Sequence, residues 1–107
     1  MKRALVTGGS GAIGAAICRV LAADGLHVVI HANSRLETAQ ALAEEICANG
    51  GSASALCFDV ADAAASTVAL EKLLQDGPIQ VLVNNAGIHR DGILAGMSQE
   101  QWHSVID

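Results

Sequence analysis

The sequence predicts an α/β protein in which helices cover both faces of a parallel sheet, and three observations support this class. Four short apolar segments alternate with longer stretches of helical periodicity. Gly, Asn, Asp or Pro residues bound the apolar segments, as is typical of buried parallel strands. Right-handed crossovers between such strands leave few other arrangements. At 107 residues the chain is long enough for one domain but not for two.

The predicted strands cover residues 3–7, 26–31, 54–58 and 80–84. We expect them in the spatial order 3-2-1-4, as in part of a Rossmann-type doubly wound sheet. In such a sheet, ligands bind in a crevice at the carboxyl ends of the strands. The residues that follow each strand are therefore the candidates for function.

Periodicity and capping residues place the first two helices. The first is expected over residues 13–24, with an apolar face formed by Ile13, Ile17, Val20 and Leu21. Ser34 and Glu37 have the spacing of a capping box, in which each side chain accepts from the other residue's backbone N–H. The second helix is therefore expected to begin at Ser34 and to end near residues 49–51.

Two further helices follow in the prediction. The third begins after Asp62 and stops before Asp76. A fourth begins at Ser98 and has no ending signal before Asp107. We therefore expect residues 1–107 to be the N-terminal part of a longer domain, truncated in this helix.

Composition excludes several classes of protein. The formal charge of −5 lacks the basic field that binding to a nucleic acid or an anionic membrane would require. No apolar run approaches the roughly 20 residues of a membrane span. Cys18, Cys47 and Cys57 lack the spacing of a disulfide framework or a zinc site, so we expect small buried thiols. A cytoplasmic protein without a metal site is expected.

A glycine-rich turn joins the first predicted strand to the first helix. Residues 7–14 read Thr-Gly-Gly-Ser-Gly-Ala-Ile-Gly. Glycines there allow a tight turn and bring backbone N–H groups close to a pyrophosphate, which the helix dipole also attracts. A turn that only packs the helix on the sheet is the alternative. The position of the glycine-rich segment between a strand and a helix favours phosphate binding over this alternative.

The residues after the second strand distinguish the two nicotinamide dinucleotides. An NAD site usually carries an acid about 20 residues after the glycines, and residues 31–35 contain none. Arg35 can neutralise a 2′-phosphate, while Asn33 and Ser34 donate hydrogen bonds to it. NADP is the expected cofactor, with NAD as the alternative. Helix capping by Ser34 and a solvated Arg35 charge are compatible with this interpretation.

Polar residues also follow the third and fourth strands. Asp59 can accept a hydrogen bond from the adenine amino group, and Val60 can cover the ring. Capping of the next helix by Asp59 is the alternative, although Asp62 is better placed for that. Residues 84–87, Asn-Asn-Ala-Gly, leave room for a ribose against the backbone, but they also form an ordinary turn.

Together these motifs resemble the short-chain dehydrogenase/reductase family. The resemblance covers essentially the whole chain and rests on Thr7-Gly8-x-x-x-Ala12-x-Gly14, Asp59-Val60 and Asn84-Asn85-Ala86-Gly87. One departure concerns the cofactor. The basic residue that NADP-preferring members often carry at the position of Gly11 is absent.

The resemblance implies a role for each matching residue. Around the pyrophosphate it places Gly8, Ser10, Gly11, Ile13 and Gly14. At the adenosine phosphate it places Asn33, Ser34 and Arg35, and at the adenine it places Asp59 and Val60. Along the nicotinamide ribose it places Asn85, Ala86 and Gly87. It also implies that Asn84 stabilises the sheet through neighbouring strands.

The resemblance also implies an activity. Residues 84–97 are similar to the 3-oxoacyl-acyl-carrier-protein and acetoacetyl-coenzyme-A reductases within the family. This similarity implies an NADPH-dependent oxidoreductase of fatty acid biosynthesis that acts on a small or carrier-bound acyl substrate, as a homotetramer. The family's catalytic Ser, Asn and Tyr-x-x-x-Lys lie beyond the equivalent of Asp107, and the chain contains no Tyr. We therefore expect no catalytic residue here.

Two interpretations of the chain follow. It supplies the cofactor-binding half of such an enzyme, or it is a non-catalytic dinucleotide-binding module or inactive truncated product. The four histidines are not expected to replace the missing acid. His27 and His31 share one face of the second predicted strand, and neither has an acid beside it.

Overall fold

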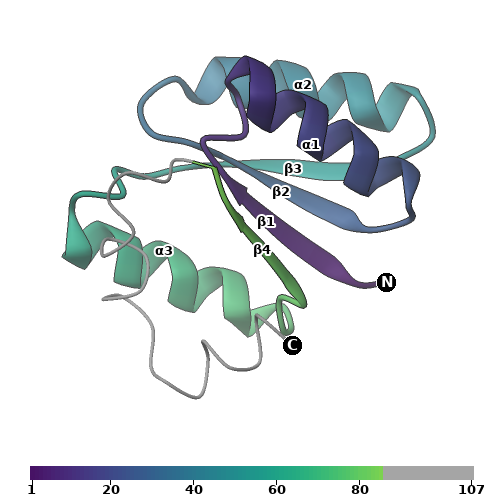
Figure 1. Ribbon diagram of the computed structural model, residues 1–107. Coiled ribbons are helices and arrows are strands. Elements are labelled where there is room, and N and C mark those ends of the chain that lie inside the picture. The colour runs from purple at the N-terminus through teal and green to yellow at the C-terminus, as the bar shows by residue number, and fades with distance from the viewer. Residues whose placement is uncertain (86–107) are drawn as a thin grey trace.

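The computed structural model describes residues 1–85, which form a parallel sheet with helices on both faces (Figure 1). The elements are β1 (Arg3–Thr7), α1 (Ala12–Ala23), β2 (His27–Ala32), α2 (Leu36–Ala48), β3 (Ser52–Cys57), α3 (Ala63–Gln75) and β4 (Val81–Asn84). The strand order is β3-β2-β1-β4, and every neighbouring pair is parallel. The predicted fold class and strand order are confirmed. The helix expected from Ser98 lies outside the described residues.

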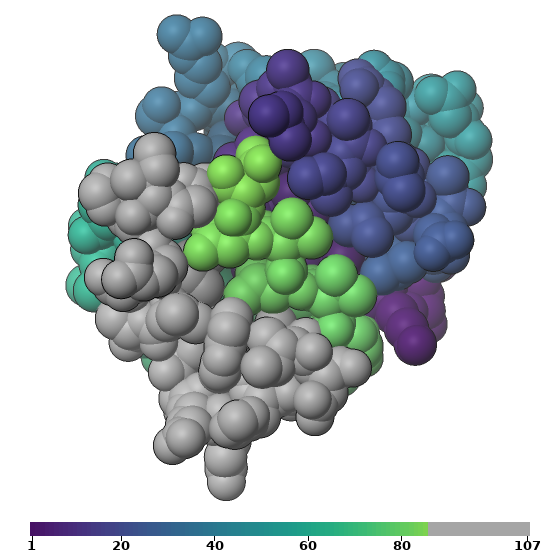
Figure 2. All heavy atoms as spheres, viewed as in Figure 1, coloured from purple at the N-terminus to yellow at the C-terminus, as the bar shows by residue number. Residues whose placement is uncertain are grey.

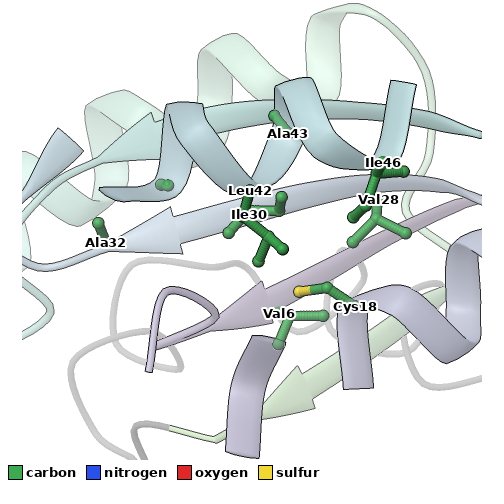
Figure 3. Close-up of a cluster of buried hydrophobic side chains, with 9 residues drawn as sticks. Val6, Cys18, Val28, Ile30, Ala32, Leu42, Ala43 and Ile46 are labelled. Atoms are coloured by element: carbon green, nitrogen blue, oxygen red, sulfur yellow. The ribbon is translucent and has the colours of Figure 1, made fainter. Parts of the chain in front are cut away.

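Two apolar clusters hold the layers together, one on each face of the sheet. The larger lies between the sheet and the α1–α2 layer (Figure 3), and its buried members are Val6, Cys18, Val28, Ile30, Ala32, Ala39, Leu42, Ala43 and Ile46. The smaller lies on the α3 side and contains Leu5, Val29, Phe58, Leu70 and Ile79. Successive residues of β1 and β2 alternate between the two clusters, as the two-residue period of a strand requires.

The buried face of α1 differs from the prediction. Its buried residues are Gly14 and Cys18, whereas Ile13 and Val20 are 72% and 67% exposed. Small residues allow the helix to lie close to the backbone of the preceding turn: a Cβ on Gly14 would lie 2.4 Å from the Gly8 carbonyl oxygen. The prediction is confirmed for Ile17 and Leu21, which are half-buried and pack against the larger cluster. It is wrong for Ile13 and Val20, because the close approach at Gly14 turns the helix so that these two side chains face outward.

The predicted capping box at the start of α2 is absent. The N-cap residue is Arg35, with φ −107° and ψ 77°, and no side chain caps the helix. Ser34 therefore lies one residue outside the position from which its oxygen would reach the first-turn N–H groups. At α3 the predicted cap is present, because Asp62 accepts a hydrogen bond from the Ala65 N–H at 3.0 Å.

The outer strand β3 begins earlier than predicted. It pairs with β2 from Ser52↔His27 to Cys57↔Ala32, so Ser52 and Ala53 belong to the sheet. The cysteines also depart from expectation. Cys18 is buried, and burial raises the pKa of its thiol to about 11, but Cys47 and Cys57 are exposed. In the described part of the chain no helix has both the length and the apolar character needed to cross a membrane.

Candidate functional site

The carboxyl ends of the four strands meet at one edge of the sheet. Thr7 at the end of β1 pairs with Asn84 at the end of β4, and the Thr7 hydroxyl donates to the Asn84 Oδ1 at 3.0 Å. This bond between neighbouring strands is the stabilising contact that the resemblance implies for Asn84. The segments that follow each strand carry the predicted site residues. Ala86 and Gly87 lie outside the described residues.

The glycine turn is packed so closely that a side chain would be crowded at Gly9 and does not fit at Gly14. A Cβ on Gly9 would lie 3.0 Å from Ile30 Cγ2 and 3.1 Å from the Val6 carbonyl oxygen. A Cβ on Gly14 would lie 2.7 Å from the Gly9 Cα, in addition to its overlap with the Gly8 carbonyl. Gly8 itself has φ +64°, in the left-handed region. These glycines therefore bring the start of α1 close to the sheet edge.

The N-terminus of α1 suits an anion. The N-cap Gly11 provides no side-chain cap, and the first turn has no acidic residue. A Cβ on Gly11 would meet only the Gly8 carbonyl oxygen, at 3.6 Å, so the outer side of the turn is open. Gly11 and Ile13 are exposed, and Ser10 is half-buried. Backbone N–H groups at an uncapped N-terminus, together with the helix dipole, fit a phosphate group.

The segment after β2 is exposed and carries an unpaired cation. Within residues 1–85, Arg35 forms no salt bridge, and the ion pair between Arg19 and Glu45, at 2.6 Å, joins α1 to α2. Asn33 has a structural contact, since its Oδ1 accepts from the Val60 N–H at 2.9 Å. Its NH₂ group remains available to a ligand.

Asp59 and Val60 follow β3 beside this segment. Asp59 is exposed, and its Oδ1 accepts from the Ala61 N–H at 2.9 Å, which forms a local turn. The capping of α3 belongs to Asp62, so the alternative role considered for Asp59 is not the one observed. Val60 is half-buried and packs against the smaller apolar cluster.

Asn85 joins the end of β4 to the glycine turn. Its Nδ2 donates to the Gly8 carbonyl oxygen at 3.1 Å. In Figure 2 the atoms at the end of β4 lie directly beside those at the start of α1. The first residue after β4 therefore fixes the turn from the side opposite β2.

The sequence did not predict the role of His31 beside the glycine turn. This residue of β2 is fully buried, and its Nδ1 accepts a hydrogen bond from the Gly8 N–H at 3.0 Å. Its Nε2 lies 2.7 Å from the Phe58 carbonyl oxygen. Burial lowers the pKa of His31. The available signal was a polar residue in an otherwise apolar strand, which must find partners inside the fold.

The described residues contain no group of three His, Cys, Asp or Glu side chains suited to holding a metal ion. The polar groups at the strand ends are instead amides, a guanidinium, a carboxylate and an uncapped helix terminus. This set matches the mixed polar and charged surface of a dinucleotide.

Comparison with curated proteins identifies close sequence relatives. The chain is 42% identical to the 3-oxoacyl-[acyl-carrier-protein] reductase FabG of Staphylococcus aureus, over 99% of this chain and 44% of the relative. It is 43% identical to the FabG protein of Escherichia coli, over 99% of this chain and 42% of the relative. The chain thus spans less than half the length of these curated relatives.

Solved structures of similar proteins have the same fold. A metagenomic short-chain oxidoreductase in complex with NADP is 36% identical, with a TM-score of 0.76, covering 97% of this chain and 47% of that protein. A gluconate 5-dehydrogenase from Burkholderia cenocepacia, in complex with NADP and tartrate, is also 36% identical, with a TM-score of 0.74, covering 97% of this chain and 41% of that protein. The family model for short chain dehydrogenases matches residues 2–107. The chain therefore belongs to the short-chain dehydrogenase family.

Proposed function

We propose that this chain binds a nicotinamide dinucleotide, NADP in preference to NAD, as the cofactor-binding half of an oxidoreductase. One observation carries the proposal: two features follow neighbouring strands at the carboxyl edge of the sheet. The uncapped N-terminus of α1 follows β1, and Arg35, which forms no salt bridge within residues 1–85, follows β2. The first attracts a pyrophosphate and the second a 2′-phosphate. The NADP named in the two solved relatives supports the assignment.

In this proposal each segment holds one part of the cofactor. The pyrophosphate lies on the turn, against Gly8, Ser10, Gly11, Ile13 and Gly14. The 2′-phosphate accepts hydrogen bonds from Asn33, Ser34 and Arg35. The adenine lies against Asp59 and Val60. The nicotinamide ribose lies along Asn85, Ala86 and Gly87.

The substrate proposed for the whole protein is a 3-oxoacyl thioester on a carrier protein or coenzyme A. The names of the relatives from Staphylococcus aureus and Escherichia coli support it. The bound cofactor would supply a hydride to the ketone. The residues of this chain hold and orient that cofactor. A cytoplasmic homotetramer remains our expectation for the whole protein.

Arg35 provides the most direct test. A partly shielded hydrogen-bonded charge pair is worth about 1.5 kcal/mol or more, so Arg35→Ala should weaken NADPH binding about tenfold and leave NADH unchanged. Fluorescence titration of the chain with each cofactor measures both. Arg19→Ala is the matched control, because it removes an equal charge from α1 and should alter neither affinity. Equal wild-type affinities for NADPH and NADH, or equal losses of both in Arg35→Ala, would contradict the NADP assignment.

Nucleotide binding without turnover is the second candidate for these 107 residues, and it is favoured by the absence of tyrosine from the sequence. In the family a tyrosine donates the proton that the reduced carbonyl needs. Incubation of the chain with NADPH and acetoacetyl-coenzyme A should therefore leave the NADPH absorbance constant. Steady consumption of NADPH would contradict this candidate.

A further inference from the structure

The buried imidazole of His31 connects two loops of the candidate site. The Gly8 N–H on one side donates to its Nδ1 at 3.0 Å, and the Phe58 carbonyl oxygen on the other lies 2.7 Å from its Nε2. Gly8 begins the glycine turn after β1, and Phe58 directly follows β3. The side chain of β2 therefore links the proposed pyrophosphate-binding turn to the proposed adenine-binding segment.

Only one protonation state of His31 satisfies both partners. A backbone N–H can only donate and a carbonyl oxygen can only accept, so Nδ1 must be bare and Nε2 must carry hydrogen. The imidazolium would direct an Nδ1–H at the Gly8 N–H, two donors facing each other. His31 has no exposed surface, so water cannot separate them without local opening.

We propose that His31 is a positioning residue for the dinucleotide, and that its protonation breaks the hydrogen bond to the Gly8 amide, loosens the glycine turn and weakens binding. This inference rests on the proposed function. His31 does not contact the ligand in this arrangement. It acts through the Gly8 amide and the Phe58 carbonyl, which keep the two loops at a fixed separation. Asn85 holds the same turn through the Gly8 carbonyl, and the Gly9 N–H donates to the backbone carbonyl oxygen of His31 at 2.9 Å. The imidazole therefore controls one of three hydrogen bonds that hold the turn to its neighbouring segments.

The groups around the imidazole determine when it titrates. Burial lowers the pKa of His31, while the hydrogen bond to Phe58 and the carboxylate of Asp59 raise it in part. The Phe58 ring lies against the imidazole, with centroids 4.3 Å apart. Residues 6–9, from β1 and the turn, have no ionisable side chain, and the charged side chains of α3 are exposed.

These surroundings fix the sign of the pH dependence. The folded protein favours the neutral imidazole, which makes both hydrogen bonds. At pH values above the ordinary pKa of 6.5, both hydrogen bonds are therefore present. The hydrogen bond to the Gly8 amide is lost as the pH falls through the lowered pKa of the folded state. Dinucleotide binding should therefore weaken on the acidic side of neutrality.

Two variants separate positioning from simple packing. His31→Asn keeps an oxygen near the position of Nδ1, which can accept from the Gly8 N–H but does not titrate. His27→Asn is the matched control on the same face of β2. Within residues 1–85, the partners of the His27 imidazole are the hydroxyls of Ser52 and Ser54, at 2.6 and 3.1 Å. Burial also lowers the pKa of His27, so the control removes a histidine whose pKa is shifted in the same direction but which lies away from the turn.

Two measurements apply to the 107-residue chain. Amide hydrogen exchange without ligand, corrected for intrinsic rates, is followed from pH 8 down to the lowest pH at which circular dichroism shows the fold intact. Gly8 protection should fall at least tenfold over this range in wild type and stay level in His31→Asn. Calorimetric titration with NADP⁺ over the same range should show a larger loss of affinity in wild type and His27→Asn than in His31→Asn. The 2′-phosphate also titrates near pH 6, and this contribution cancels between variants.

The outcomes distinguish the inference from the function on which it rests. Failure of wild type to bind NADP⁺ at any pH overturns the proposed function, and the inference with it. Binding at pH 8 with the same pH profile in wild type and His31→Asn overturns the inference alone. If His31→Asn does not fold by circular dichroism, pH-independent exchange of the wild-type Gly8 amide overturns it.

Discussion

The glycine turn and the segment after β2 lie at the same sheet edge but are built in opposite ways. The turn is fixed from both sides, by His31 and Asn85, and is packed until no Cβ fits at Gly14. The side chains of Ser34 and Arg35 are exposed, and neither caps α2. The difference teaches that one part of the proposed site is fixed by the packing of the fold, whereas the other part has exposed side chains, to which we assign the selection of the ligand.

Gly14→Ala should break the packed region, with the largest effect. The new Cβ would lie 2.4 Å from the Gly8 carbonyl oxygen, a backbone atom that cannot turn away. We expect the free energy of unfolding to fall by about 3 kcal/mol. We also expect dinucleotide binding to be lost. Urea denaturation measures the fall in unfolding free energy. Gly11→Ala is the control, since its Cβ would make only an ordinary contact with the Gly8 carbonyl oxygen at 3.6 Å, and replacing the N-cap glycine by alanine should cost about 1 kcal/mol. Equal losses in the two variants would refute the packing argument.

Asn33→Asp should change ligand choice without changing the fold. The carboxylate keeps an oxygen that accepts from the Val60 N–H, so the unfolding free energy should stay within about 0.5 kcal/mol. Its negative charge should repel the 2′-phosphate and lower NADPH affinity about tenfold, while NADH binding is retained. Fluorescence titration with both cofactors measures the change in preference. Unchanged NADPH affinity would place the 2′-phosphate elsewhere.

Asn85→Ala should loosen the turn without filling any space. It removes the hydrogen bond to the Gly8 carbonyl oxygen, and we expect a loss of about 1 kcal/mol in unfolding free energy. Thermal and urea denaturation measure it. Asn49→Ala is a control at an exposed amide on the C-terminal side of α2, where the effect should be smaller. An unchanged unfolding free energy in Asn85→Ala would mean that packing and the hydrogen bonds from Gly8 and Gly9 to His31 are enough to fix the turn.

Ser34→Ala should have the smallest effect on stability. Ser34 lies outside α2, so its loss should leave the unfolding free energy within about 0.5 kcal/mol. NADPH affinity should fall modestly through the loss of one phosphate donor. A loss of about 1 kcal/mol in the unfolding free energy would instead indicate that Ser34 caps α2, as the sequence predicted.

The sequence predicted what depends on local pattern and chain connectivity. The strand order follows from crossover rules, and the cap at Asp62 follows from its position before a helical segment. The start of β3 was missed because Ser52 and Ala53 are weak strand formers that β2 recruits by pairing. Partners distant in the sequence were also missed. His31 bonds Gly8 across 23 residues and Phe58 across 27, and no local pattern shows such contacts.

Roles at the site were less predictable than its location. The sequence predicted that the candidate residues lie at one edge of the sheet, and the parallel strands do bring their carboxyl ends together there. The second, structural contacts of Asn33 and Asn85 depend on side-chain directions that appear only when the loops are packed. The buried face of α1 was misjudged for a similar reason, since Gly14 is chosen by distance to a backbone atom.

The central position of β1 has a consequence for biosynthesis. Its final residue, Thr7, is bonded to Asn84, which is 77 residues later in the chain. At about 5–20 residues per second, a ribosome needs roughly 4–15 s to travel between them. During that interval β1 can pair with β2 on one side only, and its other row of N–H and C=O groups has no strand beside it. The strand that is made first therefore completes its hydrogen bonding last, and the nascent chain carries an open sheet edge until β4 emerges.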